Sequence, residues 1–343
     1  MICLTLYVIK YAYILDKRNS FNTCLSLLSI RGLKTHFFTS KGTVKAVDGV
    51  DLDINKKEAV GLVGETGCGK TCTALSIMRL IPLPGRIIEG QILYKEKDLL
   101  SLTEVEMRQV RGKEITMIFQ DPFTFLNPLM KVGEQVAESI LSHTEHSPED
   151  SEVTRLMYDV LKRVRLPYPE RTARFYPYEL SGGMRQRVMT AMAVSCNPAL
   201  LIADEPTTAL DVTIQAQILE LIKQLKEELG LSLLLITHNL GIVSELCDRV
   251  YVMYAGKVIE YGDIFQIFEA PVHPYTIGLL KSALSMDRLT KKLEGIQGSV
   301  PNMIDPPEGC RFHPRCFKAK PQCNYEEPSL VEIEKNHWVS CFF

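Results

Sequence analysis

The chain has 343 residues, of which 46% are hydrophobic and 23% charged, so its composition indicates a globular protein with a sizeable core and about two domains. Its 39 Lys and Arg residues and 41 Asp and Glu residues give a net charge of −2. This charge argues against a protein that binds the nucleic-acid backbone by electrostatic attraction alone. No stretch reaches the roughly 20 apolar residues of a membrane-spanning helix. Residues 1–15 lack a basic leader and a small-residue cleavage site, so we expect the chain to stay in the cytoplasm.

Apolar patterns in the first two thirds of the chain predict an α/β protein. Residues 22–38 and 43–54 are β-rich and joined by a Ser-Lys-Gly turn, which predicts paired strands at a sheet edge. Continuous apolar runs are typical of parallel strands buried on both faces. Two occur, at residues 59–63 and 199–203, and residues 231–236 form a similar run with one Ser. A helical apolar pattern ending at Gly230 connects the last two runs. We therefore expect a parallel sheet with helices on its faces.

The remaining segments predict three further parts. Residues 132–179 are helical in pattern and more polar, with a loop at residues 147–150, which indicates an inserted α-helical subdomain over about residues 130–180. Residues 249–261 read as a hairpin with Ala255-Gly256 at its turn. Residues 271–343 are rich in Pro and Cys and weakly periodic, so we expect an appended small domain rather than a continuation of the core.

A glycine-rich segment directly after the first apolar run fits the pattern G-x-x-x-x-G-K-[ST] and precedes an apolar helical stretch. Glycines let backbone N–H groups point at phosphate oxygens, and the following helix adds its positive end. We expect Lys70 to hold the β- and γ-phosphates and the Thr71 hydroxyl to bind Mg²⁺. The predicted nucleotide-binding residues here are Gly64, Glu65, Thr66, Gly67, Cys68, Gly69, Lys70, Thr71 and Cys72. Because Cys68 lies near a helix N-terminus, we expect a lowered thiol pKa and loss of nucleotide binding on alkylation.

Polar residues at strand ends are candidates for metal binding and catalysis. Asp204 and Glu205 follow an apolar run at the edge of the sheet where ligands bind in open α/β folds. Beside a phosphate loop, Asp204 is expected to reach Mg²⁺, and Glu205 to orient or deprotonate a water. Gln120 and His238 also follow apolar runs, where each by itself is equally consistent with an ordinary structural residue.

Residues 180–187, LSGGMRQR, predict a second helix N-terminus that binds an anion. A chain with one phosphate loop needs a second such end only if that end contacts a nucleotide held by another subunit. At this motif the sequence resembles the ATP-binding cassette (ABC) transporter ATPases, whose signature is similar to LSGGQ. The resemblance covers about residues 25–270.

This resemblance implies a P-loop NTPase fold: a RecA-like parallel sheet with helices on both faces, an antiparallel β subdomain and an inserted α-helical subdomain. It implies ATP and Mg²⁺ as ligands, with Mg²⁺ held by Thr71, Gln120 and Asp204. The implied catalytic residues are Glu205, His238, Gln120 and Lys70. The implied nucleotide contacts from the signature and the D-loop are Ser181, Gly182, Gly183, Met184 and Asp211. Phe38, with Phe37 as the alternative, is the candidate to stack on adenine.

Three C-terminal segments, residues 271–276, 298–301 and 310–316, look like the tail of dipeptide/oligopeptide importer ATPases. Similar tails occur in nickel importers, which leaves nickel as the alternative cargo. The resemblance implies an ATP-hydrolysing subunit at the cytoplasmic face of the cell membrane. Its implied partners are a second, related ABC ATPase subunit, two transmembrane permeases and an external substrate-binding protein. Residues 1–24 depart from the family as an N-terminal extension or a misassigned start.

Four of the ten cysteines gather near the C-terminal end: Cys310, Cys316, Cys323 and Cys341. Their spacing is unlike the paired cysteines of zinc ribbons or ferredoxins. From the residues alone, Zn²⁺, an iron–sulfur cluster and unliganded thiols remain equal alternatives, with His313 or His337 able to replace one thiol. The resemblance favours a structural [4Fe-4S] cluster held by the four cysteines.

Two rival classes share part of this pattern. Soluble ABC ATPases that act on nucleic acid or ribosomes usually carry two cassettes or a long coiled-coil insertion, and the sequence has neither. A metal-binding module that only senses ATP would not require Glu205. We therefore expect an ATPase without a nucleic-acid partner.

Overall fold

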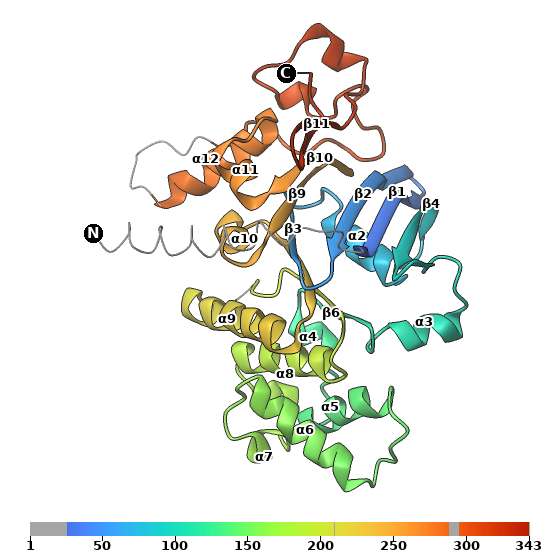
Figure 1. The fold of residues 1–343 in the computed structure, drawn as a ribbon, viewed down its shortest axis with the longest axis vertical. Coiled ribbons are helices and arrows are strands. Elements are labelled where there is room, and N and C mark those ends of the chain that lie inside the picture. Colours follow the sequence, from blue (N-terminus) through green and yellow to red (C-terminus); the bar gives the residue numbers. More distant parts are fainter. Residues whose placement is uncertain (1–25, 209, 288–294, 343) are drawn as a thin grey trace.

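The computed structural model describes residues 26–208, 210–287 and 295–342, which form two β-sheets with helices around them (Figure 1). The predicted extension at residues 1–24 lies outside the described residues. The larger sheet has eight strands in the order β11-β12-β10-β9-β3-β8-β7-β6. Its strands are β3 (Ala59–Val63), β6 (Ile115–Ile118), β7 (Leu200–Asp204), β8 (Ser232–Thr237), β9 (Arg249–Tyr254), β10 (Lys257–Asp263), β11 (Val331–Glu334) and β12 (His337–Val339).

The centre of the larger sheet is parallel, as the apolar runs predict. β3 pairs in parallel with β8 and β9, and β7 pairs in parallel with β8 and β6. Every residue of β3, β7 and β8 is buried, and alternate side chains enter two core clusters on opposite faces. The predicted hairpin is confirmed as β9 and β10, with positive φ angles of 45° at Ala255 and 83° at Gly256.

The smaller sheet is antiparallel and has the strand order β2-β1-β4-β5. It consists of β1 (Ser26–Thr39), β2 (Gly42–Asn55), β4 (Gly85–Tyr94) and β5 (Lys97–Asp98). Within the described residues, β1 and β2 are the paired strands that the sequence predicts. The helix α2 (Lys70–Ile77) shares a core cluster with both sheets, and α3 (Glu104–Val110) adds Met107 to it.

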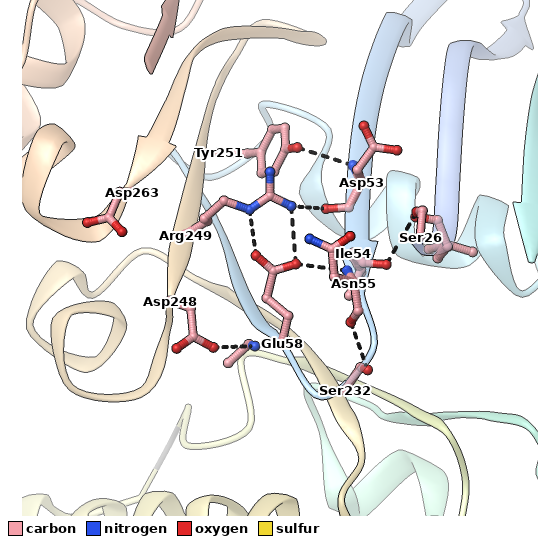
Figure 2. Close-up of polar contacts among 12 residues, drawn as sticks. Ser26, Asp53, Ile54, Asn55, Glu58, Ser232, Asp248, Arg249, Tyr251 and Asp263 are labelled. Atoms are coloured by element: carbon pink, nitrogen blue, oxygen red, sulfur yellow. Dashed lines mark hydrogen bonds and ion pairs between the residues drawn. The ribbon is translucent and has the colours of Figure 1, made fainter. Parts of the chain in front are cut away.

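A network of polar contacts joins the two sheets where β2 leads into β3 (Figure 2). Arg249 on β9 donates from Nε to Oε1 of Glu58 at 2.5 Å and from Nη2 to the Asp53 carbonyl oxygen at 2.8 Å. Glu58 Oε2 accepts the backbone N–H of Asn55 at 2.8 Å. A carboxylate as buried as Glu58 is costly without such partners. The network therefore holds the strand that leads to the phosphate loop.

A group of helices lies at the end of the molecule opposite the C-terminus (Figure 1). It includes α4 (Pro122–Phe125), α5 (Val132–Leu141), α6 (Ser151–Arg163), α7 (Pro169–Thr172), the 3₁₀ turn η1 (Pro177–Glu179) and α8 (Gly182–Val194). Residues of α5, α6 and α8 form a core cluster together with Leu221 and Leu225, which belong to the later helix α9 (Val212–Leu229). The helices of this group agree with the helical pattern predicted over residues 132–179, and Asp150, in the predicted loop, caps α6.

The crossover between β7 and β8 contains α9 (Val212–Leu229), which ends at Gly230 in the left-handed conformation, as predicted. Three more helices follow along the chain: α10 (Leu240–Leu246), α11 (Ile264–Glu269) and α12 (Pro274–Asp287). Among the described residues, none of the helices combines the length and the apolar character that crossing a membrane requires.

The C-terminal segment is joined to the core, contrary to the expectation of an appended domain over residues 271–343. β12 pairs with β10, so the β11–β12 hairpin continues the larger sheet. The fully buried Glu260 on β10 accepts the backbone N–H groups of Val272 and His273 at 2.8 and 3.0 Å, and its Oε1 lies 2.9 Å from Nε2 of His337. Single charged and aromatic residues make this attachment, and such residues leave no periodic apolar signal in the sequence.

Candidate functional site

The phosphate loop at residues 64–71 connects β3 to α2 and has a backbone that requires glycine. Gly64 and Gly69 have positive φ angles of 156° and 109°. A Cβ atom at Gly64 would lie 2.2 Å from the Met253 carbonyl oxygen, and one at Gly69 would lie 2.3 Å from that of Ala46. Gly69 is the N-cap of α2 and provides no side-chain cap. No side chain of the cap therefore competes with an anion for the first N–H groups of the helix.

Lys70 is buried, and its ammonium group points back into the loop. Its Nζ donates to the carbonyl oxygens of Gly64 at 2.7 Å and Glu65 at 3.0 Å. Thr66 and Gly67 are exposed at the tip of the loop. The loop thus places one buried cation beside its own carbonyl oxygens, where a phosphate group can replace them.

Thr71 and Asp204 form the pair predicted to bind Mg²⁺. The Thr71 hydroxyl donates to Oδ1 of Asp204 at 3.2 Å. Burial raises the pKa of Asp204 to about 6, against the opposing effects of the Thr71 hydrogen bond and the Lys70 charge. A buried carboxylate beside a hydroxyl oxygen fits the oxygen preference of Mg²⁺, which would favour the ionised form. Gln120, the third predicted ligand, contacts Glu205 instead of this pair.

Glu205 is the point at which the predicted catalytic residues meet. Gln120 donates from Nε2 to its Oε2 at 3.1 Å, and Nδ1 of His238 lies 3.2 Å from its Oε1. Thr208 also donates to Oε2, at 3.0 Å. The backbone of Glu205 has a positive φ of 44°, which is uncommon for a residue other than glycine. The sequence reasoning missed Thr208 as a partner, although its position three residues after the carboxylate is a usable signal.

The signature residues begin α8 and lie against the start of α9. Ser181 caps α8 by accepting the N–H of Met184 at 3.4 Å, and Asp211 caps α9 by accepting that of Ile214 at 3.0 Å. A Cβ atom at Gly183 would lie 2.7 Å from Cγ2 of Ile214, so the two helix starts are close together. Gly182 is half-buried beside them. Figure 1 shows α8 within the helical group and α2 beside the smaller sheet.

The two aromatic candidates for the adenine site differ in exposure. Phe38 is 47% exposed at the end of β1 and lines a cavity of about 430 Å³ with Leu83, Pro84 and Arg86. Phe37 is half-buried against Gly85. Of the two rings, Phe38 has the more accessible face.

The prediction that Cys68 has a lowered pKa is wrong. Its side chain is fully buried, and burial raises the pKa of the thiol despite the nearby Lys70. Burial also raises the pKa of Cys72 to about 12. The loss of hydration therefore outweighs the favourable end of the helix at both positions.

The four C-terminal cysteines are here called the cysteine region. Cys310 and Cys316 flank the 3₁₀ turn η2 (His313–Arg315), Cys323 lies in η3 (Pro321–Asn324), and Cys341 follows β12. The N–H of Cys310 donates to the carbonyl oxygen of Cys323 at 2.9 Å. Burial raises the pKa of Cys310, and the neighbouring thiols of Cys323 and Cys316 add to the increase.

The predicted metal site is not assembled in this region. Across residues 26–208, 210–287 and 295–342, no three His, Cys, Asp or Glu side chains are arranged to hold a metal ion. Nδ1 of His313 lies 3.0 Å from the carbonyl oxygen of Cys310, and the buried His337 contacts Glu260, so neither ring replaces a thiol ligand. The residues as placed do not fit a four-cysteine cluster.

Comparisons with known proteins agree with a nucleotide site at the phosphate loop and around Glu205. A family model described as ABC transporter matches residues 47–208, and one described as oligopeptide/dipeptide transporter, C-terminal region, matches residues 259–323. An oligopeptide transport ATP-binding protein of Bacillus subtilis is 50% identical over 92% of this chain and 96% of its own length. A dipeptide transport ATP-binding protein of the same organism is 46% identical over 92% and 94%.

Solved structures extend the comparison to bound nucleotide. A dimeric ATP-binding cassette in a post-hydrolysis state with ADP and phosphate matches with a TM-score of 0.63 and 26% identity. The match covers 69% of this chain and 98% of that one. Together with the phosphate loop and the residues around Glu205, these likenesses establish that the chain belongs to the ABC transporter family of ATP-binding proteins.

Proposed function

We propose that this chain hydrolyses ATP to drive the uptake of dipeptides or oligopeptides. The observation that carries the proposal is the arrangement around Glu205, where Gln120, Thr208 and His238 surround a carboxylate next to the Thr71–Asp204 pair. The names of the oligopeptide and dipeptide transport relatives support the class of cargo.

In this proposal the phosphate loop wraps the triphosphate of ATP. Lys70 leaves the carbonyl oxygens of Gly64 and Glu65 and binds the β- and γ-phosphates. Thr71 and Asp204, with Gln120 nearby, hold Mg²⁺, which supplies positive charge beside the phosphates. The exposed ring of Phe38 stacks on the adenine.

Hydrolysis needs a water aligned with the γ-phosphate. Glu205 accepts hydrogen bonds from Gln120 and Thr208 on Oε2, and its Oε1 lies 3.2 Å from Nδ1 of His238. These contacts orient the carboxylate to position that water and to accept its proton. His238 contacts the γ-phosphate and stabilises the charge that develops on it.

The second side of each nucleotide comes from another subunit. Ser181, Gly182, Gly183 and Met184 begin a helix in a part of the chain separate from α2 (Figure 1). A partner ATPase would place the equivalent helix start against the nucleotide bound here, and Asp211 would lie near that contact. The dimeric form of the related cassette supports this arrangement. ATP then favours the closed dimer, and hydrolysis loosens it.

The assembly includes two transmembrane permeases and an external substrate-binding protein that acts through them. We place the chain at the cytoplasmic face of the membrane, bound to the permeases. A [4Fe-4S] cluster or Zn²⁺ in the cysteine region stays a prediction from the family resemblance alone, because the described residues contain no group of three side chains arranged to hold a metal ion. Iron, sulfide and zinc analysis of the anaerobically purified chain tests it, and a metal-free chain would contradict it.

The test of function is purification with the permeases, reconstitution in vesicles, and measurement of ATP hydrolysis with the loaded binding protein outside. We expect peptides to stimulate phosphate release and to enter the vesicles, and Lys70→Ala to abolish both. Stimulation by nickel with no response to peptides would overturn the peptide assignment. No cargo-dependent hydrolysis with either ligand would overturn the importer assignment.

A further inference from the structure

The side chain of Glu65 in the phosphate loop is held by the C-terminal segment of the chain. Arg315, the last residue of η2, donates from Nη1 to Oε2 of Glu65 at 2.6 Å and from Nη2 to Oε1 at 3.0 Å. The hydroxyl of Tyr275, in the first turn of α12, accepts the backbone N–H of Glu65 at 2.8 Å. Two residues from beyond position 270 therefore fix both the backbone and the carboxylate of one loop residue.

Arg315 is itself fixed before it reaches Glu65. Its side chain is 6% exposed, and its guanidinium donates to the carbonyl oxygens of Gln297 at 2.9 Å and Gly298 at 3.2 Å. The guanidinium also lies 5.8 Å from the centroid of the Tyr254 ring. Because the planar group cannot turn without breaking these contacts, it dictates where the Glu65 carboxylate lies.

The pairing matters because Glu65 is the one acidic residue among residues 64–71. Its carbonyl oxygen is 3.0 Å from Nζ of Lys70, so Glu65 adjoins the cation that is expected to bind phosphate. A free carboxylate on the loop would lie within about one Debye length, roughly 10 Å, of a bound triphosphate and would repel it. The Arg315 cation neutralises the carboxylate and fixes its position, so the carboxylate does not repel the triphosphate.

We propose that Arg315 is a positioning residue of the nucleotide site, which neutralises Glu65 and so allows the phosphate loop to accept a triphosphate. This inference rests on the proposal that residues 64–71 bind ATP. It makes the C-terminal segment part of the ATPase site rather than only an attachment.

The test is the dissociation constant for MgATP, measured by equilibrium dialysis on the full-length chain. We expect Arg315→Ala to raise it by about five- to tenfold, as neighbouring charged groups are coupled on this scale. Adding Glu65→Gln to Arg315→Ala is expected to restore the constant to within about twofold of the unmodified chain, because the repulsive charge is gone. The loss in Arg315→Ala is also expected to shrink as salt is added, which a purely structural defect would not do.

Arg311 provides a matched control from the same turn. Its guanidinium pairs with Asp48 and donates to the Ala255 carbonyl oxygen at 2.6 Å, away from Glu65. We expect Arg311→Ala to leave the MgATP constant unchanged. An equal loss in Arg311→Ala, a normal constant in Arg315→Ala, or no recovery on adding Glu65→Gln would each overturn the inference.

Two further variants keep the test decisive. If Arg315→Ala does not fold, Arg315→Gln is compared with Arg315→Gln plus Glu65→Gln, and the second must bind MgATP more tightly. Lys70→Ala separates the proposal that residues 64–71 bind ATP from the proposal about Arg315. If Lys70→Ala binds MgATP as well as the unmodified chain does, the assignment of residues 64–71 as the phosphate site is wrong. If Lys70→Ala fails to bind and Arg315→Ala binds normally, only the role of Arg315 is wrong.

Discussion

The surroundings of Glu205 and the cysteine region both contain side chains of the types that bind charged ligands, but only those around Glu205 are brought together. Glu205 follows a fully buried strand, and polar groups from three chain segments lie within 3.2 Å of its oxygens. Three of the cysteines lie on or beside short turns, where the N–H groups of Cys310 and Lys320 contact atoms of Cys323. A sheet edge brings distant segments to one point, whereas each turn sets only its own local geometry.

The largest effect is expected from a substitution that removes the carboxylate of Glu205 but keeps the shape of its side chain. Glu205→Gln removes the carboxylate that the proposed mechanism assigns as proton acceptor but retains an oxygen, so we expect ATP hydrolysis to fall about 10³-fold. Bound ATP is expected to persist. Phosphate release and retained nucleotide, measured in the same sample, check this. Glu220→Gln, on the exposed side of α9, is the control and keeps normal turnover. Unchanged hydrolysis in Glu205→Gln would remove Glu205 from the mechanism.

The second-largest effect concerns the contacts that attach the C-terminal segment to the larger sheet. Glu260→Ala leaves two backbone N–H groups and the His337 ring without their buried partner, so we expect a loss of about 3 kcal/mol in the free energy of unfolding. Urea unfolding measures it, with the exposed Glu334→Ala as the control. If the cysteines hold the segment through a metal, Cys310→Ser will cost at least as much as Glu260→Ala. A smaller cost favours the Glu260 contacts as the main attachment.

A moderate effect concerns pH at the Mg²⁺ pair. The pKa of Asp204 is about 6, above its ordinary value, so protons compete with Mg²⁺ below that pH. We expect the Mg²⁺ concentration for half-maximal hydrolysis to rise about tenfold per unit as pH falls below about 6. It is expected to stay constant above that pH. Without Mg²⁺, the stability that the protonated Asp204 contributes is lost as pH rises through its folded pKa.

Buffers between about pH 5 and pH 8 cover this range. Glu220→Gln, which changes an exposed residue of α9, is expected to keep the same profile. A flat response of the Mg²⁺ requirement would show that Asp204 does not bind the ion in its ionised form.

The smallest effect is expected at Cys68. Because the thiol is buried and its pKa is raised, N-ethylmaleimide should leave MgATP binding unchanged. Cys68→Ser is expected to alter the dissociation constant by less than about twofold. Rapid loss of binding on alkylation, prevented by Cys68→Ser, would mean that the loop opens enough to expose this thiol.

Much of the fold could be predicted from local patterns in the sequence. The buried runs at β3, β7 and β8 and the Ala255-Gly256 turn were predictable because burial and backbone preference act within a few residues. The strand end before Glu205 indicated that carboxylate, since parallel strands bring their carboxyl ends to one edge. The roles expected of Gln120 and His238 came from the family resemblance.

Contacts between distant segments left no such signal. The pairing of Glu65 with Arg315 and the attachment of His337 to Glu260 each involve two residues separated by long stretches of chain. Thr208 lies three residues after Glu205, and this spacing is a local signal, but it is not specific because a threonine after a strand has many other uses. The pKa of Cys68 depends on packing that the motif does not describe.

The left-handed backbone at residue 205 implies a trade-off between catalytic activity and thermal stability. A side chain with a Cβ atom is strained at this φ, while glycine is not. Glycine there would relax the strand end and, under the proposed mechanism, would remove the proton acceptor in one step. We therefore expect Glu205→Gly to lose turnover and yet to resist heat better than the unmodified chain.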